Sequence, residues 1–122
     1  MNSITHEFNG HVAVELISDA PLLSSAGDAL NLIHENATGF IILHQQNLHP
    51  DFFALANGVA GDICQKFVNY RCHLAVVGDY TSLESGSRRD FIFECNKGSY
   101  VMFPASVAEA LQKFADRIGA IR

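Results

Sequence analysis

The stretch Cys72-His73-Leu74-Ala75-Val76-Val77-Gly78-Asp79 decides the fold class of this chain. Its apolar part, Leu74 to Val77, is short and unbroken and ends at a glycine and an aspartate. Such a run is typical of a strand that is covered on both faces, as the central strand of a parallel sheet is. The segment from Asn47 to Arg71 leads into this strand and carries apolar residues at helical spacing. We therefore expect a crossover helix followed by a buried parallel strand, which defines an α/β domain.

The N-terminal segment has the pattern of a β-hairpin. Apolar and polar residues alternate over Ile4–Phe8 and again over Val12–Ile17, with Asn9-Gly10 between them. Asparagine and glycine both tolerate the positive φ angles of a type I′ turn, so this dipeptide favours a tight turn. The sequence predicts that the two segments pair antiparallel.

The rest of the chain alternates between helical and strand patterns. Serines followed three residues later by an acidic residue have the spacing of a helix-capping box, and short apolar runs indicate strands. On these signals we predict helices from Ser25 to Gly39, from about Gly58 to Tyr70, from Ser87 to Gly98 and from Ser106 to Gly119, and strands over Phe40–His44 and Tyr100–Phe103. The order β-β-α-β-α-β-α-β-α predicts a single domain over residues 1–122, with a five-stranded, mostly parallel sheet and an N-terminal antiparallel hairpin.

The composition fits one globular domain without a nucleic-acid or membrane role. The chain has 122 residues, of which 48% are hydrophobic and 17% are charged, enough for a core of its own. With 13 acidic and 8 basic residues its net charge is -5, whereas binding to phosphate backbones needs a basic face. No apolar run approaches the roughly 18 residues of a membrane span, and the N-terminal residues lack the pattern of a signal peptide.

The cysteines indicate a reducing compartment. Cys64, Cys72 and Cys95 are odd in number, and none belongs to a C-x-x-C pair, which favours free thiols over a disulfide framework. Cys64 and Cys72 lie in apolar periodic segments, so we interpret them as core residues and not as nucleophiles. We expect a soluble cytoplasmic protein.

Two blocks of motifs resemble a known family. The first block consists of Asn47-Leu48, Pro50-Asp51-Phe52-Phe53, Gly58 with Ala60-Gly61, and Gln65-Lys66-Phe67 with Asn69-Tyr70-Arg71; the second consists of Val77-Gly78-Asp79 and Arg89-Asp90-Phe91-Ile92 with Glu94, Asn96 and Gly98. On these residues the chain from Ile42 to Leu111 resembles a small bacterial family known as domain of unknown function 4180. The resemblance implies no established activity.

The predicted element order also resembles the STAS and anti-sigma-factor-antagonist architecture, which has the same run of strands and helices. Such regulators often carry a phosphorylatable serine at the start of the helix after their third strand. Here that region reads Gln45 to Asp51 and then Asn57-Gly58, without serine or threonine. The resemblance therefore implies a regulatory fold that lacks a phospho-switch of this kind.

Polar residues from distant segments are expected to meet at one edge of the sheet. In open α/β sheets, ligands bind beyond the carboxyl ends of the strands, and Asp79 follows directly on the predicted central strand. Asn47 and Asp51 follow the neighbouring strand, and Arg89 lies in the first turn of the next helix. We predict that these four side chains converge around one polar cleft. Two roles stay open for Arg89. It pairs with a carboxylate of the protein, or it binds an anionic ligand at the helix N-terminus.

Catalytic and metal chemistry have less support in the sequence. His44, His49 and Asp51 have side chains that bind metals, but their spacing matches no established motif. The chain contains neither a Gly-x-Ser-x-Gly elbow nor a glycine-rich phosphate loop. We therefore assign no catalytic residue, no metal and no cofactor, and an enzyme is the least favoured class.

Two functions from different classes follow from these observations. The first is a non-enzymatic regulatory or interaction module of STAS-like architecture with a protein partner. The alternative is a domain that binds a small molecule at the carboxyl ends of the parallel strands. An anionic ligand is one version of this alternative. We also expect a homodimer, because Phe52 and Phe53 lie at an irregular helix start and would be shielded from water by a second copy.

Overall fold

The computed structural model describes residues 2–36, 38–49, 52, 58–80, 90, 92 and 100–121. In chain order their elements are β1 (Asn2–Phe8), β2 (His11–Ile17), α1 (Ala26–Glu35), β3 (Phe40–His44), the short 3₁₀ helix η1 (Gln45–Asn47), α2 (Val59–Asn69), β4 (His73–Val77), β5 (Val101–Met102) and α4 (Val107–Ile121). None of the described helices is long and apolar enough to cross a membrane.

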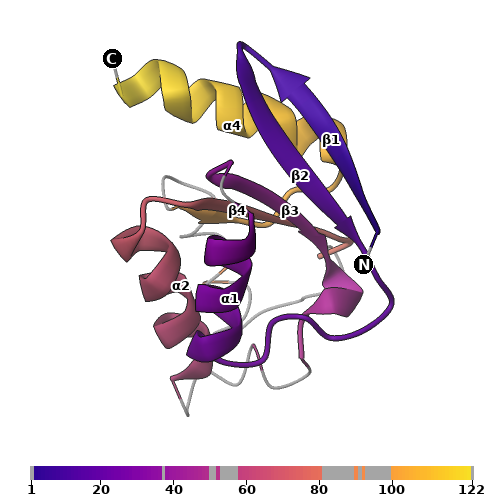
Figure 1. Cartoon of the computed structure of the whole chain (residues 1–122), viewed down its shortest axis with the longest axis vertical. Helices are drawn as coiled ribbons and strands as arrows, with labels where there is room; N and C mark the ends of the chain where they lie inside the picture. Colours follow the sequence, from indigo (N-terminus) through magenta and orange to yellow (C-terminus); the bar gives the residue numbers. More distant parts are fainter. Residues whose placement is uncertain are drawn as a thin grey trace.

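The strands form one sheet in the order β1-β2-β3-β4-β5. β1 and β2 are antiparallel, and each later pair of neighbours is parallel. α1 and α2 cover one face of the sheet and α4 covers the other (Figure 1). The predicted fold class is therefore confirmed. β3 holds the middle position of the sheet, and β4, the strand predicted as central, is the interior strand beside it.

The predicted hairpin is confirmed in its turn and in its pairing. Asn9 and Gly10 have φ angles of 46° and 80°, the left-handed values that a two-residue type I′ turn requires. β1 and β2 pair continuously from Asn2–Ile17 to Phe8–His11. This register fixes which side chains share a face. The even-numbered residues of β1 and the odd-numbered residues of β2 lie on the α4 face, where Phe8 packs against Phe114 of α4.

Each face of the sheet has its own apolar core. The core on the α4 face consists of Ala13, Phe40, Ile42, Ala75, Met102, Ala110 and Phe114. The larger core lies under α1 and α2 and includes Leu16, Leu23, Leu32, Ile41, Leu43, Ile63, Phe67, Leu74 and Val76. Three consecutive residues of β4 (Leu74, Ala75 and Val76) are fully buried, because the strand is covered from both sides.

Serine caps begin α1 and α4 as the sequence predicts. The Oγ of Ser25 accepts a hydrogen bond from the amide of Asp28 at 3.2 Å, and the Oγ of Ser106 accepts one from the amide of Glu109 at 3.1 Å. These bonds satisfy amide groups that have no partner inside the helix. The sequence therefore predicts the start of each of these helices from a hydrogen bond between residues three positions apart.

Two predicted helix ends are wrong. α1 ends at Glu35 and not at Gly39, because Asn36 follows it in a non-helical conformation and donates its side-chain amide to the carbonyl of Leu32. α4 continues through Gly119 to Ile121. A glycine inside a helix costs only about 1 kcal/mol relative to alanine, so a helix can continue through it.

Phe52 lies in the core and not on the surface. Its side chain is fully buried, and its ring centroid lies 6.3 Å from that of Phe103. The expectation that this ring packs against a second copy is therefore wrong, and Phe53 lies outside the described residues. The helix predicted from Ser87 to Gly98 also lies outside them, except for Asp90 and Ile92, which are both helical.

Two glycines give a matched test of the turn. Gly10→Ala should lower the free energy of unfolding by about 1 kcal/mol, because alanine disfavours a positive φ. Gly61→Ala in α2 should raise it by up to about 1 kcal/mol, because alanine is the better helix former. A Cβ at either position meets no atom within 4 Å, so backbone conformation alone decides the sign. Urea unfolding measures both, and effects of equal sign would contradict the type I′ turn.

Candidate functional site

Glu15 of β2 is a buried acid. Only 7% of its surface is exposed. It lies on the α4 face of the sheet, in register with Ile4 of β1 and Ile42 of β3. A carboxylate in such a place costs free energy unless hydrogen-bond donors replace the water that it loses.

Two histidines from the neighbouring strands supply those donors. Nε2 of His6 lies 2.9 Å from one carboxylate oxygen of Glu15, and Nε2 of His44 lies 2.6 Å from the other. His6 lies two residues along β1 from the residue opposite Glu15, and His44 lies two residues along β3 from Ile42. Both histidines are therefore diagonal neighbours of the acid on one face of the sheet. We call Glu15, His6 and His44 the Glu15 cluster.

The protonation of the Glu15 cluster follows from its hydrogen bonds. An ionised carboxylate only accepts hydrogen bonds, so each imidazole donates to it through its Nε2–H. Burial raises the pKa of Glu15, but hydrogen bonds from His44 and His6 and the positive charge of these rings outweigh burial. The pKa of Glu15 therefore lies below its ordinary value of 4.5. An ionised carboxylate thus joins β1, β2 and β3.

The hydrogen bonds of the Glu15 cluster join three strands, and the described residues form no metal site around it. Each carboxylate oxygen of Glu15 accepts one hydrogen bond from a ring nitrogen, so the carboxylate links three strands. Among the residues that the structure describes, no group of three or more His, Cys, Asp or Glu side chains could hold a metal ion. Of the metal ligands considered from the sequence, His44 bonds to Glu15, and Asp51 lies outside the described residues.

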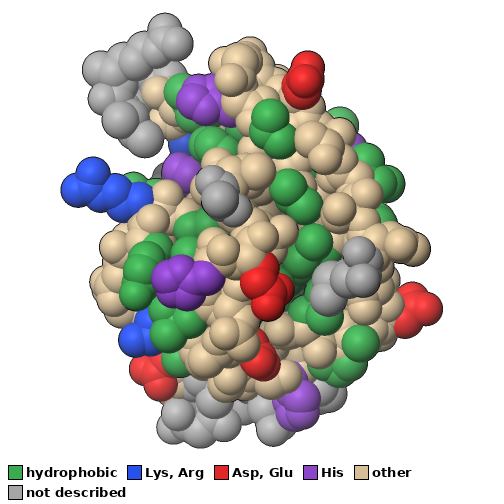
Figure 2. Space-filling model, viewed as in Figure 1, with side chains coloured by type: hydrophobic (Ala, Val, Ile, Leu, Met, Phe, Trp, Pro, Cys, Tyr) green, Lys and Arg blue, Asp and Glu red, His purple; other side chains and the backbone are tan. Residues whose placement is uncertain are grey.

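The surface over the Glu15 cluster combines exposed apolar side chains with the two histidines. Ile4 is 48% exposed and Ile17 is 40% exposed, and the two are diagonal neighbours on the α4 face of the hairpin. The side chains of His6 and His44 are 23% and 27% exposed. We call these four residues the hairpin patch. Hydrophobic side chains are spread along the hairpin side of the molecule (Figure 2). A shallow hollow of about 360 Å³ adjoins the patch, lined by Asn2, Ile17, Ser18, Asp19, His44 and Gln46.

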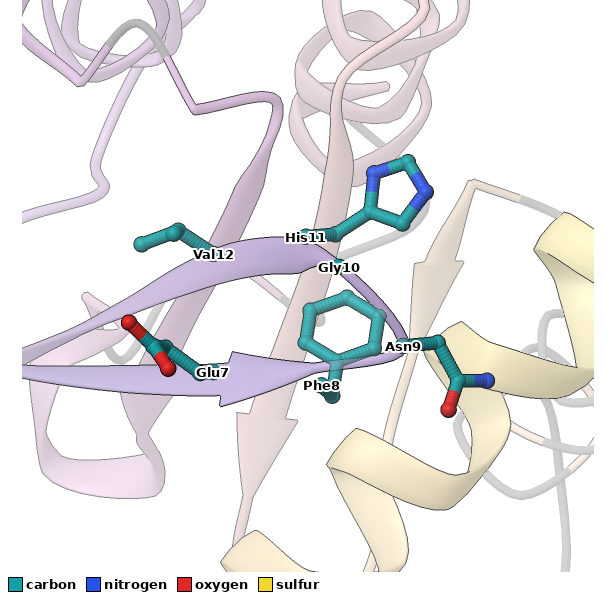
Figure 3. A pocket seen from close by; sticks show the side chains of 6 residues that line it. All are labelled: Glu7, Phe8, Asn9, Gly10, His11 and Val12. Carbon is teal, nitrogen blue, oxygen red and sulfur yellow. The ribbon is translucent and has the colours of Figure 1, made fainter.

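A second hollow, of about 370 Å³, lies at the turn of the hairpin. Its lining consists of the six consecutive residues from Glu7 to Val12 (Figure 3). Figure 3 shows Glu7 and Val12 on the strands and His11 and Asn9 pointing apart at the turn. Because one short segment forms all its walls, this hollow does not bring chemical groups from distant parts of the chain together. We assign no site to it.

Asn47, one of the four predicted site residues, is fully buried and hydrogen-bonded to the chain itself. Its side-chain nitrogen donates to the carbonyls of Ser18 and Ala20 at 2.8 and 3.0 Å, and its Oδ1 accepts from the amide of His44 at 2.9 Å. Its own carbonyl accepts from the amides of Leu22 and Leu23. These bonds hold the segment after β2 against the end of β3, which is a structural role.

Asp79, the second predicted site residue, is exposed where β4 ends. It borders a hollow of about 300 Å³ whose lining also includes Gly78, Tyr80, Phe103, Ala105 and Glu109. Asp51 and Arg89 lie outside the described residues. The convergence of Asn47, Asp51, Asp79 and Arg89 therefore stays a prediction.

His73 of β4 is buried, and its surroundings are aromatic. Its ring stacks on Phe40 with centroids 4.9 Å apart and lies 4.5 Å from the ring of Tyr100. Burial, with the nearby charge of Arg117, lowers the pKa of His73 to about 4. The ring is therefore neutral at physiological pH and serves as a flat packing surface between the sheet and α4.

Sequence reasoning missed the Glu15 cluster, although part of its signal is present. The Asn9-Gly10 turn fixes the register of the hairpin and so makes His6 a diagonal neighbour of Glu15. The partner from β3, His44, has no comparable signal, because the pairing of β2 with β3 depends on the crossover through α1. Alternation along β2 places Glu15 on the face opposite the apolar Val14 and Leu16, and the pattern alone does not show that this acid is buried.

Comparison with known proteins identifies one family. Residues 8–114 match the profile of a family described as a domain of unknown function, DUF4180. No match is found among curated proteins or among solved structures.

Replacing Glu15 tests the hydrogen bonds of the cluster. Glu15→Gln should lower the free energy of unfolding at pH 7 by about 1–3 kcal/mol, because a charged acceptor of two buried hydrogen bonds is lost. A lowered native pKa stabilises the fold above the ordinary value of 4.5, and this stabilisation is lost as the pH falls through the native pKa. The deficit of the variant should therefore shrink below about pH 4.5, as urea unfolding at pH 7 and pH 3.5 measures.

The control is Glu35→Gln at the end of α1, where the side chain is exposed. It should change the free energy of unfolding by no more than about 0.5 kcal/mol at either pH. An acid dependence of Glu15→Gln identical to that of the unmodified chain would contradict the ionised, doubly bonded carboxylate.

Proposed function

We propose that this chain, which belongs to the DUF4180 family of domains of unknown function, is a non-enzymatic interaction module whose binding surface is the hairpin patch. The observation that carries the proposal is the exposure of Ile4 and Ile17, which are diagonal neighbours on the sheet face whose β3 and β4 residues are buried under α4. Single exposed apolar residues are ordinary, whereas adjoining ones beside partly exposed polar groups are typical of protein contact surfaces.

The position of α4 explains why this part of the face is open. α4 packs against β3 and β4 and reaches the hairpin at Phe8, next to the turn. Figure 1 shows the helix across the turn end of β1 and β2, while the opposite end of these strands extends beyond it. Ile4 and Ile17 lie at that opposite end. A partner that covers them would bury the part of the sheet face that α4 leaves exposed.

The Glu15 cluster gives the hairpin patch a fixed shape. A two-stranded hairpin by itself is only marginally stable, and here the carboxylate ties β1 to β2 and to the end of β3. A surface held in one conformation loses less entropy when it binds. The cluster therefore supports a role in recognition without taking part in chemistry.

The architecture and the compartment are part of the same proposal. A hairpin followed by parallel strands and crossover helices supports STAS-like architecture and a regulatory role, without a serine switch after β3. Cys72, which is buried, is a free thiol, and this supports the cytoplasm as the compartment.

The second candidate function is binding of a small molecule at the carboxyl end of β4. The hollow there has an aromatic wall, because the rings of Tyr80 and Phe103 meet edge to face at 5.5 Å. Asp79 and Glu109 also border it. These acids disfavour an anionic ligand unless Arg89, which lies outside the described residues, offsets them.

Site-specific photo-crosslinking in cells tests the interaction module. A photo-reactive residue in place of Ile4 should give discrete crosslinked products, because the hairpin patch contacts a partner. The matched control is the same residue in place of Val68, which is 39% exposed on α2 and lies away from the patch. Products at position 68 as abundant as those at position 4, or none at position 4, would contradict the proposal.

A further inference from the structure

We propose, building on the interaction-module function, that the hairpin patch recognises a second copy of this chain through antiparallel pairing of β1 with β1 of the partner copy. β1 is the outer strand of the sheet order. Within the residues that the structure describes, no strand pairs with its outer side. Pairing across this edge would join two sheets into one.

β1 has few of the features that keep an edge strand single. Natural edge strands are protected by charged side chains, above all lysine, by proline, by bulges or by short length, and of these β1 has only the charge of Glu7. β1 is seven residues long, reads Asn-Ser-Ile-Thr-His-Glu-Phe, and pairs with β2 without a bulge. Ser3, Thr5 and Glu7 are exposed. The outer edge is therefore a regular template for a further strand.

The hairpin turn decides which backbone groups face outward. Residues that flank a two-residue turn form a hydrogen-bonded pair, and such pairs alternate along an antiparallel ladder. Phe8 flanks the turn, so Phe8, His6 and Ile4 direct their N–H and C=O groups toward β2. The N–H and C=O groups of Ser3 and Thr5 then point away from the sheet, as do those of Glu7.

These outward groups are self-complementary around a two-fold axis at Thr5. In that register Thr5 lies opposite Thr5 of the second copy, and Ser3 lies opposite Glu7. Each of these pairs exchanges two N–H···O bonds. Facing threonines are a favourable cross-strand pair, and the single charge of the strand meets a hydroxyl instead of a second carboxylate. A register centred on Glu7 would instead oppose two carboxylates. The symmetry of this edge therefore favours a second copy over an unrelated strand.

The same register covers the hairpin patch. On the α4 face, Ile4 of each copy lies opposite His6 of the other, directly beside Glu15 of its own chain. The Ile4 side chain of each copy loses contact with water, and His6 is covered from the side that faces solvent. One interface thus pairs the outward backbone groups of β1 and buries Ile4 of the hairpin patch.

Substitutions at Thr5 test the pairing while leaving the hairpin intact. The N–H of Thr5 points outward, so Thr5→Pro removes an intermolecular donor from each copy without removing a bond to β2. We expect the unmodified chain to sediment as a dimer at high micromolar concentration. Thr5→Pro should raise the dissociation constant about thirtyfold, from the loss of two hydrogen bonds. Thr5→Val keeps the donor and should leave the dimer in place.

A second pair of variants tests the register directly and does not depend on the stability of a proline variant. Under mild oxidation Thr5→Cys should form a disulfide between copies, because the two residues at position 5 face each other. Ser3→Cys should not, because its counterpart lies four positions away along the strand.

The unmodified chain sedimenting as a monomer, or equal crosslinking of the two cysteine variants, would overturn the pairing. In those cases photo-crosslinking from position 4 to a different protein would still support the interaction module. Its absence would end both proposals.

Discussion

The carboxylate of Glu15 is the interaction on which the hairpin and its exposed surface depend. It is buried on a sheet face, and each of its oxygens accepts from a histidine on a different neighbouring strand. A buried charge is tolerated only when its partners are complete, and removing one partner leaves an uncompensated charge that costs several kcal/mol. β1, β2 and the end of β3 are therefore coupled through one side chain. The apolar part of the same face is secured by α4.

His44 connects this cluster with the hydrogen bonds of Asn47. Its side chain bonds to Glu15, and its backbone amide donates to Asn47. Asn47 in turn holds the segment that leaves β2, through the carbonyls of Ser18 and Ala20. The end of β2 is thus held to the end of β3 by hydrogen bonds of the His44 and Asn47 side chains. Ile17 of the hairpin patch directly precedes Ser18, so the same bonds restrain it.

The local features of the fold could be predicted from the sequence, and the long-range ones could not. Asn9-Gly10 and the serine caps act within a few residues, so a short stretch of sequence is enough to predict them. Burial of Glu15 depends on its neighbours from two other strands, Ile4 and His6 of β1 and Ile42 and His44 of β3. Alternation along β2 places this acid on the face opposite Val14 and Leu16, and only the pairing of the three strands shows what surrounds it there. The core position of Phe52 is missed for the same reason, because it packs near Phe103, which is far away in the sequence.

The measurement that tests the central claim most directly is the protonation of the Glu15 cluster by nuclear magnetic resonance. A proton–nitrogen correlation spectrum of the imidazole rings reports which nitrogen of each histidine carries the proton, and a pH titration follows the carboxyl carbon of Glu15. The account predicts that His6 and His44 both carry a proton on Nε2 and that the Glu15 carboxyl titrates below 4.5. An unprotonated Nε2 on either ring at neutral pH, or a Glu15 midpoint at or above 4.5, would contradict it.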